Sequence, residues 1–212
     1  IKVGVTIPLS PPGSVEMGHE ARTGLEIMKD YINQNGGVNG RQITLVYEDD
    51  QGLPEKGRAA TEKLITQEKV VAVTGPLQSS VCLAAIEVAH RYGTPYVNTN
   101  CWSDAVRKKG YPEVFSVGNY NSRVSAAVAE TIGKMNVKRV VAFAENTDYG
   151  IGLANLIADL MKRNHPSVQF TFHVLDRAGK DFMPAVLPLK SNPPDMVVNL
   201  MLPPASYVIG NQ

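Results

Sequence analysis

The chain has 212 residues, of which 43% are hydrophobic and 19% are charged, a composition typical of one or two globular domains with buried cores. Its 21 lysines and arginines nearly balance its 20 aspartates and glutamates, so charge gives no reason to expect a nucleic acid or an anionic membrane as a partner. No stretch approaches the roughly 18 consecutive apolar residues that a membrane-spanning helix needs.

The first half of the chain alternates short apolar runs with segments of helical periodicity. The predicted strands of this half are residues 2–7, 43–47, 70–74, 95–98 and 114–117. The expected buried face of the first helix consists of Ala21, Leu25, Met28 and Ile32. Because parallel neighbours need crossover helices, this alternation predicts a doubly wound parallel α/β sheet. In the strand order 2-1-3-4-5, the third and fourth strands are neighbours.

The third predicted strand leads into the most informative stretch of the sequence. It ends at Gly75-Pro76, a turn signal, and Ser79 and Ser80 then precede a run of helical periodicity that begins at Val81. A helix N-terminus exposes unpaired N–H groups, and a nearby serine hydroxyl can cap them or donate to a ligand oxygen. The pattern therefore predicts an anion site at these serines, with a simple N-cap role for one of them as the alternative.

The alternation of strands and helices restarts in the second half of the chain. Its predicted strands are residues 139–144, 168–174 and 195–201. A helix is expected over part of residues 182–190, although Pro184 and Pro188 limit its length. We place the boundary between Gly118 and Ser122, which gives domains at residues 1–119 and 120–212. Because only three strands follow the boundary, the second sheet lacks an edge, and the chain is expected to be part of a longer protein.

Several residue types that carry chemistry in enzymes lack a supporting pattern here. Asp49 and Asp50 are adjacent at a strand tip, where neighbouring side chains point apart, so we interpret them as loop structure and not as a catalytic pair. The 4 histidines show no metal-ligand spacing with one another or with cysteine. Phosphate-loop, nucleophile-elbow and dinucleotide-binding motifs are absent. The sequence therefore predicts no enzymatic activity, no cofactor and no metal.

The two cysteines fall on neighbouring strands of the predicted sheet. Cys82 lies in the first turn of the helix after the third strand, and Cys101 lies in the loop after the fourth. A disulfide needs Cα atoms within about 7 Å and converging Cβ vectors. The topology permits that distance but does not set the vectors. Two free, buried thiols that behave as small apolar residues are the alternative.

A series of short motifs occurs in a characteristic order. They are Ile1–Pro8, Asn33–Gly40, Asp49-Asp50 with Pro54, Gly75-Pro76 with Ser79-Ser80, Gly93–Pro95, Asp148–Gly152 and Lys180–Phe182. In this order, they resemble the type I periplasmic solute-binding proteins of the Leu/Ile/Val (branched-chain amino acid) ABC-transporter family. The resemblance covers the whole chain, about three-fifths of a member. It implies two doubly wound lobes that close on a ligand like a hinge, the second lobe being incomplete here.

The resemblance also implies roles for single residues of the first lobe. Ser79 matches the serine that holds the ligand's carboxylate, with Ser80 beside it. Asn100 matches a position whose backbone carbonyl faces the ligand's ammonium group. Trp102 departs from the family pattern, because it stands where a hydroxyl is usual. Either Ser103 supplies that hydroxyl or the ligand differs, and Trp102 also fits a half-buried packing role.

In the second lobe, Tyr149 matches a tyrosine that closes over the ligand, and it could equally cover the start of its own helix. Asp148 could be an N-cap or a ligand partner. Another family contact falls at residues 200–203, where an aromatic residue is common and this chain has aliphatic ones. An acid that would pair with an amino acid's ammonium group lies, by the resemblance, beyond Gln212.

Three classes of function follow from these observations. The resemblance favours a periplasmic or extracellular receptor that binds a small carboxylate ligand, most simply an amino acid, and delivers it to the membrane permease of an ABC transporter. The ligand could instead be an aromatic acid, another organic acid or an amide, because Trp102 offers an apolar face. The second class is a ligand-sensing module built on the same lobes. The third class, an enzyme on a doubly wound sheet, lacks a nucleophile with a base.

Overall fold

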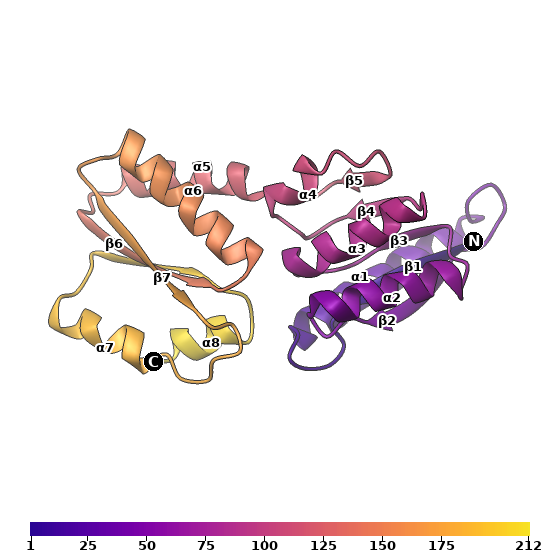
Figure 1. Cartoon of the computed structure of the whole chain (residues 1–212), viewed down its shortest axis with the longest axis horizontal. Helices are drawn as coiled ribbons and strands as arrows, with labels where there is room; N and C mark the ends of the chain where they lie inside the picture. Colours follow the sequence, from indigo (N-terminus) through magenta and orange to yellow (C-terminus); the bar gives the residue numbers. More distant parts are fainter. The chain divides into compact units, whose positions relative to one another are not determined.

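A computed structural model describes residues 1–212. The chain separates into two units, Ile1–Asn119 and Tyr120–Gln212, each with its own sheet (Figure 1). Both sheets are parallel and are covered by helices, which confirms the predicted α/β fold class. None of the helices combines the length and the apolar character that a membrane crossing requires.

The sheet of the first unit has five strands in the order β2-β1-β3-β4-β5. They are β1 (Lys2–Ile7), β2 (Thr44–Asp49), β3 (Ala72–Thr74), β4 (Tyr96–Asn98) and β5 (Val114–Ser116). The predicted order is thus confirmed. From β1, the chain adds β2 on one side and then β3 on the other, so the carboxyl ends of β1 and β3 mark a topological switch point, where open α/β sheets bind ligands.

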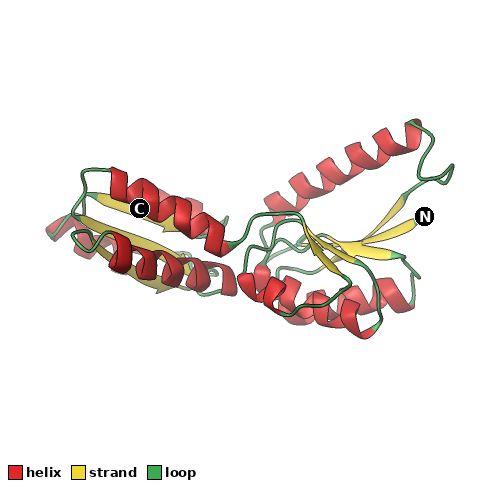
Figure 2. Cartoon of the chain, turned by 90° about the horizontal axis from the view of Figure 1, so that it is seen from above, coloured by secondary structure: helices red, strands yellow, loops and turns green.

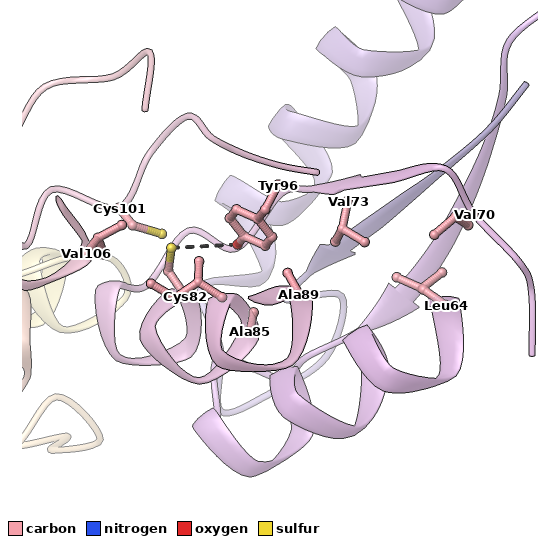
Figure 3. Packing of buried hydrophobic residues seen from close by; sticks show 10 residues of the cluster. Leu64, Val70, Val73, Cys82, Ala85, Ala89, Tyr96, Cys101 and Val106 are labelled. Carbon is pink, nitrogen blue, oxygen red and sulfur yellow. Dashed lines mark hydrogen bonds between the residues drawn. The ribbon is translucent and has the colours of Figure 1, made fainter. Parts of the chain in front are cut away.

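The helices of the first unit cover both faces of this sheet. They are α1 (Val15–Gln34), α2 (Pro54–Thr66), α3 (Ser79–Arg91) and the short α4 (Asp104–Lys108). Figure 2 shows α1 on one face and the adjacent pair α2 and α3 on the other. The main apolar cluster lies under α2 and α3 and includes Leu64, Val73 and Tyr96, all with 0% exposure (Figure 3). This cluster fixes α3, and therefore Ser79, against the sheet.

The predicted buried face of the first helix is wrong in part. Gly18 is the only fully buried residue of α1, whereas Met28, expected in the core, is 53% exposed. The physical reason is visible in Figure 2, where α1 diverges from the sheet towards its C-terminal end. The helix stays close at its start, where a Cβ atom on Gly18 would lie 1.9 Å from the carbonyl oxygen of Pro8. Glycine therefore permits this contact.

The second unit has a three-stranded sheet in the order β7-β6-β8. Its elements are α5 (Asn121–Lys134), β6 (Arg139–Glu145), α6 (Asp148–Asn164), β7 (Gln169–Leu175), α7 (Met183–Ser191), β8 (Met196–Leu200) and α8 (Ala205–Gly210). The side chains of β6 alternate between two cores. Val140 and Ala142 pack under α5 and α6, whereas Val141 and Phe143 pack under α7 and α8. The central strand is therefore buried on both faces, as parallel sheets require.

Helix α7 is longer than its prolines suggested. Pro184 lies in its first turn, where a missing N–H costs nothing, and Pro188 lies inside the helix without ending it. No residue of α7 is fully buried, although Ala185, Val186 and Leu189 pack against the apolar cluster that includes Phe143. The two prolines therefore did not predict where α7 ends.

The strand-tip carboxylates of the first unit hold loops in place. Asp49 accepts hydrogen bonds from the Ser10 hydroxyl and from the backbone N–H groups of Leu9 and Gln51, the latter two at 2.8 and 2.9 Å. Asp50 accepts one from the backbone N–H of Gly52 at 2.8 Å. These contacts agree with the interpretation of both residues as loop structure.

Stability at low pH is expected to depend on Asp49. Burial tends to raise its pKa, but the hydrogen bonds from Ser10, Leu9 and Gln51 outweigh burial and lower the pKa below its ordinary value. The folded pKa lies below the unfolded one, so this stabilisation is present above about pH 4 and is lost as the pH falls further. The urea midpoint should fall between pH 4 and pH 2, and Asp49→Asn should lower the midpoint at pH 7 and flatten that fall. An unchanged pH profile in Asp49→Asn would contradict this.

Candidate functional site

Ser79 lies where β3 leads into α3, at the carboxyl edge of the first sheet. The helix begins at Ser79, and its N-cap is Gln78, whose side chain makes no capping hydrogen bond. The alternative that one of the serines is the N-cap is therefore wrong. Ser79 is 2% exposed, and its Oγ accepts a hydrogen bond from the backbone N–H of Ser103 at 3.1 Å. Ser80, the second residue of the helix, is partly buried.

The loop after β4 is held against α3 by two polar side chains. Asn98, at the end of β4, accepts from the backbone N–H of Cys101 and donates to its carbonyl oxygen, both at 2.9 Å. Ser79 then fixes Ser103, whose own Oγ caps α4 by accepting from the N–H of Ala105 at 3.3 Å. The structure thus brings Ser79 and Ser103 into direct contact.

The other two predicted residues of this loop differ in exposure. Asn100 is exposed, and Trp102 is partly buried. Both follow the carboxyl end of β4, the strand next to β3 in the sheet. Five of the predicted site residues therefore gather at the carboxyl edge of two adjacent strands, in one polar loop and one helix start.

Cys82 and Cys101 are both free and buried, so the structure has the two thiols and not the disulfide. Figure 3 shows their side chains pointing toward one another beside Tyr96, whose hydroxyl donates to the Cys82 sulfur at 3.6 Å. The Cys101 thiol donates to the carbonyl oxygen of Pro76 at 2.9 Å. Burial, with the Cys82 thiol beside it, raises the pKa of Cys101 well above its ordinary value. These thiols are packing residues behind the Ser79 turn.

Thiol reactivity should follow from this burial. Because the thiolate is the reactive form, the folded protein should react slowly with an aromatic disulfide reagent at pH 8. After unfolding in guanidinium without reductant, it should release two thiol equivalents per chain. Zero equivalents from the unfolded, unreduced protein would mean that the two sulfurs are bonded and that this part of the structure is wrong.

Tyr149 lies in the first turn of α6, at the carboxyl edge of the second sheet. Its side chain is partly buried against the apolar cluster of this unit. Burial, with the charge of Glu145 adding to it, raises the pKa of the phenol to about 12, so the phenol is a neutral hydrogen-bonding group at physiological pH. The N-cap of α6 is Thr147, whose Oγ1 accepts from the N–H of Gly150 at 3.3 Å, so the N-cap alternative for Asp148 is wrong.

Three buried polar residues that organise these edges were not singled out from the sequence. Asn98 closes the loop after β4, Asn121 donates to the Tyr149 carbonyl oxygen at 3.0 Å, and Glu145 accepts from the N–H of Leu202 at 2.8 Å. All three are at most 3% exposed. A polar residue that ends an apolar run, as Asn98 and Glu145 do, is the signal that could have located two of them.

Comparison with known proteins identifies the family of this chain. The periplasmic binding protein family matches residues 1–210, almost the whole chain. The chain belongs to this family. A similar curated protein is the Leu/Ile/Val-binding protein BraC3 of Rhizobium johnstonii, with 25% identity over 93% of this chain and 53% of that protein. The chain thus spans about half the length of the curated relatives that it matches.

Two solved structures illustrate the range of similar proteins. The branched-chain amino acid transporter substrate-binding protein LivJ of Streptococcus pneumoniae, in complex with isoleucine, has 28% identity and a TM-score of 0.81 over 94% of this chain and 56% of that one. A solute-binding protein of an ABC transporter from R. palustris, in complex with benzoate, has 25% identity and a TM-score of 0.84 over 93% of this chain and 54% of that one. Members with this fold therefore bind different carboxylates.

Proposed function

We propose that the chain is part of an extracytoplasmic solute-binding protein of an ABC importer, which binds a small carboxylate ligand and delivers it to a membrane permease without chemical change. The observation that carries this proposal is the buried Ser79 at the start of α3, in a chain of this family. A helix N-terminus favours negative charge and exposes N–H donors. The N–H donors at the start of α3 and the Ser79 hydroxyl together can bind a carboxylate.

The proposed ligand contacts are the residues predicted from the sequence. In the first unit, Ser79 and Ser80 hold the carboxylate. The loop of Asn100, Trp102 and Ser103 lies against the rest of the ligand. In the second unit, Tyr149 covers the ligand with a neutral phenol. The two units are, in this proposal, the two lobes of the binding protein, and the protein works on the outer side of the membrane.

Two ligand classes are consistent with this arrangement. An amino acid is favoured by the relatives that are named as Leu/Ile/Val-binding proteins. An aromatic acid is favoured by Trp102, whose indole offers an apolar face, and by the similar protein that was solved with benzoate. Both classes share the carboxylate, so the contact at Ser79 serves either one.

A thermal-shift panel on the full-length protein tests this function. The panel consists of leucine, isoleucine, valine, benzoate and 3,4-dihydroxybenzoate, with benzamide as the neutral control. A ligand that binds only the folded state adds about 2.7 kcal/mol of stability at a hundredfold excess over its dissociation constant, which gives a clear shift. We expect at least one carboxylate to raise the midpoint and benzamide to leave it unchanged. A shift with benzoate alone would assign the aromatic class, and a shift with benzamide alone would reject the carboxylate site.

A further inference from the structure

Glu145, the last residue of β6, joins two segments that are far apart in the sequence of the second unit. The Thr147 hydroxyl donates to its Oε1 at 2.6 Å, and the backbone N–H of Leu202 donates to its Oε2 at 2.8 Å. The side chain is buried, with the residue 1% exposed. One carboxylate thus receives a donor from the turn before α6 and another from the segment after β8.

Each of these segments carries a candidate ligand contact or lies next to one. Thr147 is the N-cap of α6, and Tyr149 follows it in the first turn. Leu202 lies two residues beyond the end of β8 and precedes Pro203-Pro204, which have no N–H groups. The Leu202 N–H is therefore the last backbone donor of this segment before α8, and Glu145 is its acceptor. Loss of that acceptor leaves the segment without this tie to β6.

A buried carboxylate is costly unless its oxygens receive hydrogen bonds. Here each oxygen receives one, and the N-terminus of α6 next to it favours a negative charge. Gly150 adds a close backbone approach, since a Cβ atom there would lie 2.3 Å from the Glu145 carbonyl oxygen. The turn of Tyr149 is therefore packed tightly against the residue that also holds Leu202.

We propose that Glu145 is a positioning residue of the ligand site, which sets the Tyr149 turn and the Leu202 segment relative to one another at the carboxyl edge of this sheet. This inference rests on the proposed function, in which Tyr149 contacts the ligand. Glu145 itself does not touch the ligand. It acts by holding two segments with one rigid acceptor, so that both present the same surface each time a ligand binds.

The same sheet offers a second carboxylate with two donors, at its opposite edge, as a control. Asp195, which is exposed, joins the segment before β8 to the start of β6, because its Oδ2 accepts from the backbone N–H groups of Lys138 and Arg139, at 2.7 and 2.8 Å. Glu145→Ala and Asp195→Ala each remove a carboxylate that receives two donors from this unit. Glu145→Gln is the conservative variant, because its carbonyl oxygen can still accept from Leu202 while its NH₂ group donates to the Thr147 oxygen.

The experiment combines hydrogen exchange on the free full-length protein with calorimetric titration by isoleucine and by benzoate. In Glu145→Ala, we expect amide exchange to accelerate both in residues 146–150 and in residues 200–205. Affinity for the bound probe should fall about tenfold, the effect of one lost hydrogen-bond tie. Glu145→Gln should retain most of the affinity. Asp195→Ala should lower the unfolding midpoint, speed exchange near residues 138–139 and leave the affinity within about twofold.

Other results would overturn either the positioning role of Glu145 or the proposed function. Equal losses of affinity in Glu145→Ala and Asp195→Ala would mean that general stability is responsible and would overturn the positioning role. Faster exchange in only one of the two segments would overturn it as well, whether or not a ligand binds. If Glu145→Ala does not fold, an unchanged affinity and exchange profile in Thr147→Val, which removes the hydroxyl that donates to Glu145, would overturn the positioning role. Failure of the unsubstituted protein to bind any carboxylate of the thermal-shift panel would reject the proposed function, while the exchange data would still test whether Glu145 holds both segments.

Discussion

Ser79→Ala is expected to weaken binding of the carboxylate ligand about 10- to 100-fold, because a hydrogen bond to a charged group contributes roughly 1.5–3 kcal/mol. The structure gives the hydroxyl a second role, since it accepts the backbone N–H of Ser103 at 3.1 Å. Its removal therefore also releases one tie of the loop that contains Trp102. Calorimetric titration of the full-length protein, with whichever ligand shifts its unfolding midpoint, measures the combined loss.

Two further variants separate the contact from general damage. Ser79→Thr keeps the hydroxyl and should bind more tightly than Ser79→Ala. Ser125→Ala removes a hydroxyl from another buried serine, 1% exposed, which donates to the Ser122 carbonyl oxygen at 3.2 Å in α5. It should leave the affinity unchanged. If Ser79→Ala binds as tightly as the unsubstituted protein, the site lies elsewhere and the proposed carboxylate contact is wrong.

Gly150→Ala is expected to lower the free energy of unfolding by about 1–3 kcal/mol, the usual cost of forcing an extra methyl group into a packed position. The new Cβ atom would lie 2.3 Å from the carbonyl oxygen and 2.7 Å from the nitrogen of Glu145. Both are backbone atoms at the end of a central strand, so neither can yield easily. The start of α6 must move instead, and Tyr149 with it, so ligand affinity should fall too.

Gly24→Ala is the matched substitution, because Gly24 lies inside α1 and a Cβ atom there would meet nothing within 4 Å. Alanine favours the helix over glycine by about 0.5–1 kcal/mol, so this variant should be more stable than the unsubstituted protein. Urea unfolding of both variants measures these opposite changes in the free energy of unfolding. The dependence of that free energy on urea concentration should be the same in both variants, so that their midpoints can be compared. Equal stabilisation of both variants would refute the close approach of α6 to Glu145.

The order of elements and the strand topology could be predicted from the sequence, because apolar runs, glycine turns and helical periodicity are local signals. Val70–Thr74, Gly75-Pro76 and Ser79 form a continuous pattern that placed a strand, a turn and a helix start within two residues of β3 and α3. Short helices such as α8, by contrast, have too few turns for periodicity to register.

What the sequence did not predict depends on tertiary contacts. The exposure of Met28 follows from the angle of α1 to the sheet, which no local pattern contains. The tie between Glu145 and Leu202 joins residues that are 57 positions apart, so neither residue signals it alone. Ser79 was predicted as a cap or a ligand contact, and its bond to Ser103 became visible only when the loop after β4 was placed beside α3.

A crystal structure of the full-length protein with its bound ligand would locate the carboxylate and so decide whether α3 forms the site. We predict that a ligand carboxylate oxygen lies within hydrogen-bond distance, about 2.7–3.2 Å, of the Ser79 hydroxyl or of a backbone N–H in the first turn of α3, with Tyr149 against the same ligand. A ligand whose carboxylate contacts neither Ser79 nor the start of α3 would contradict it.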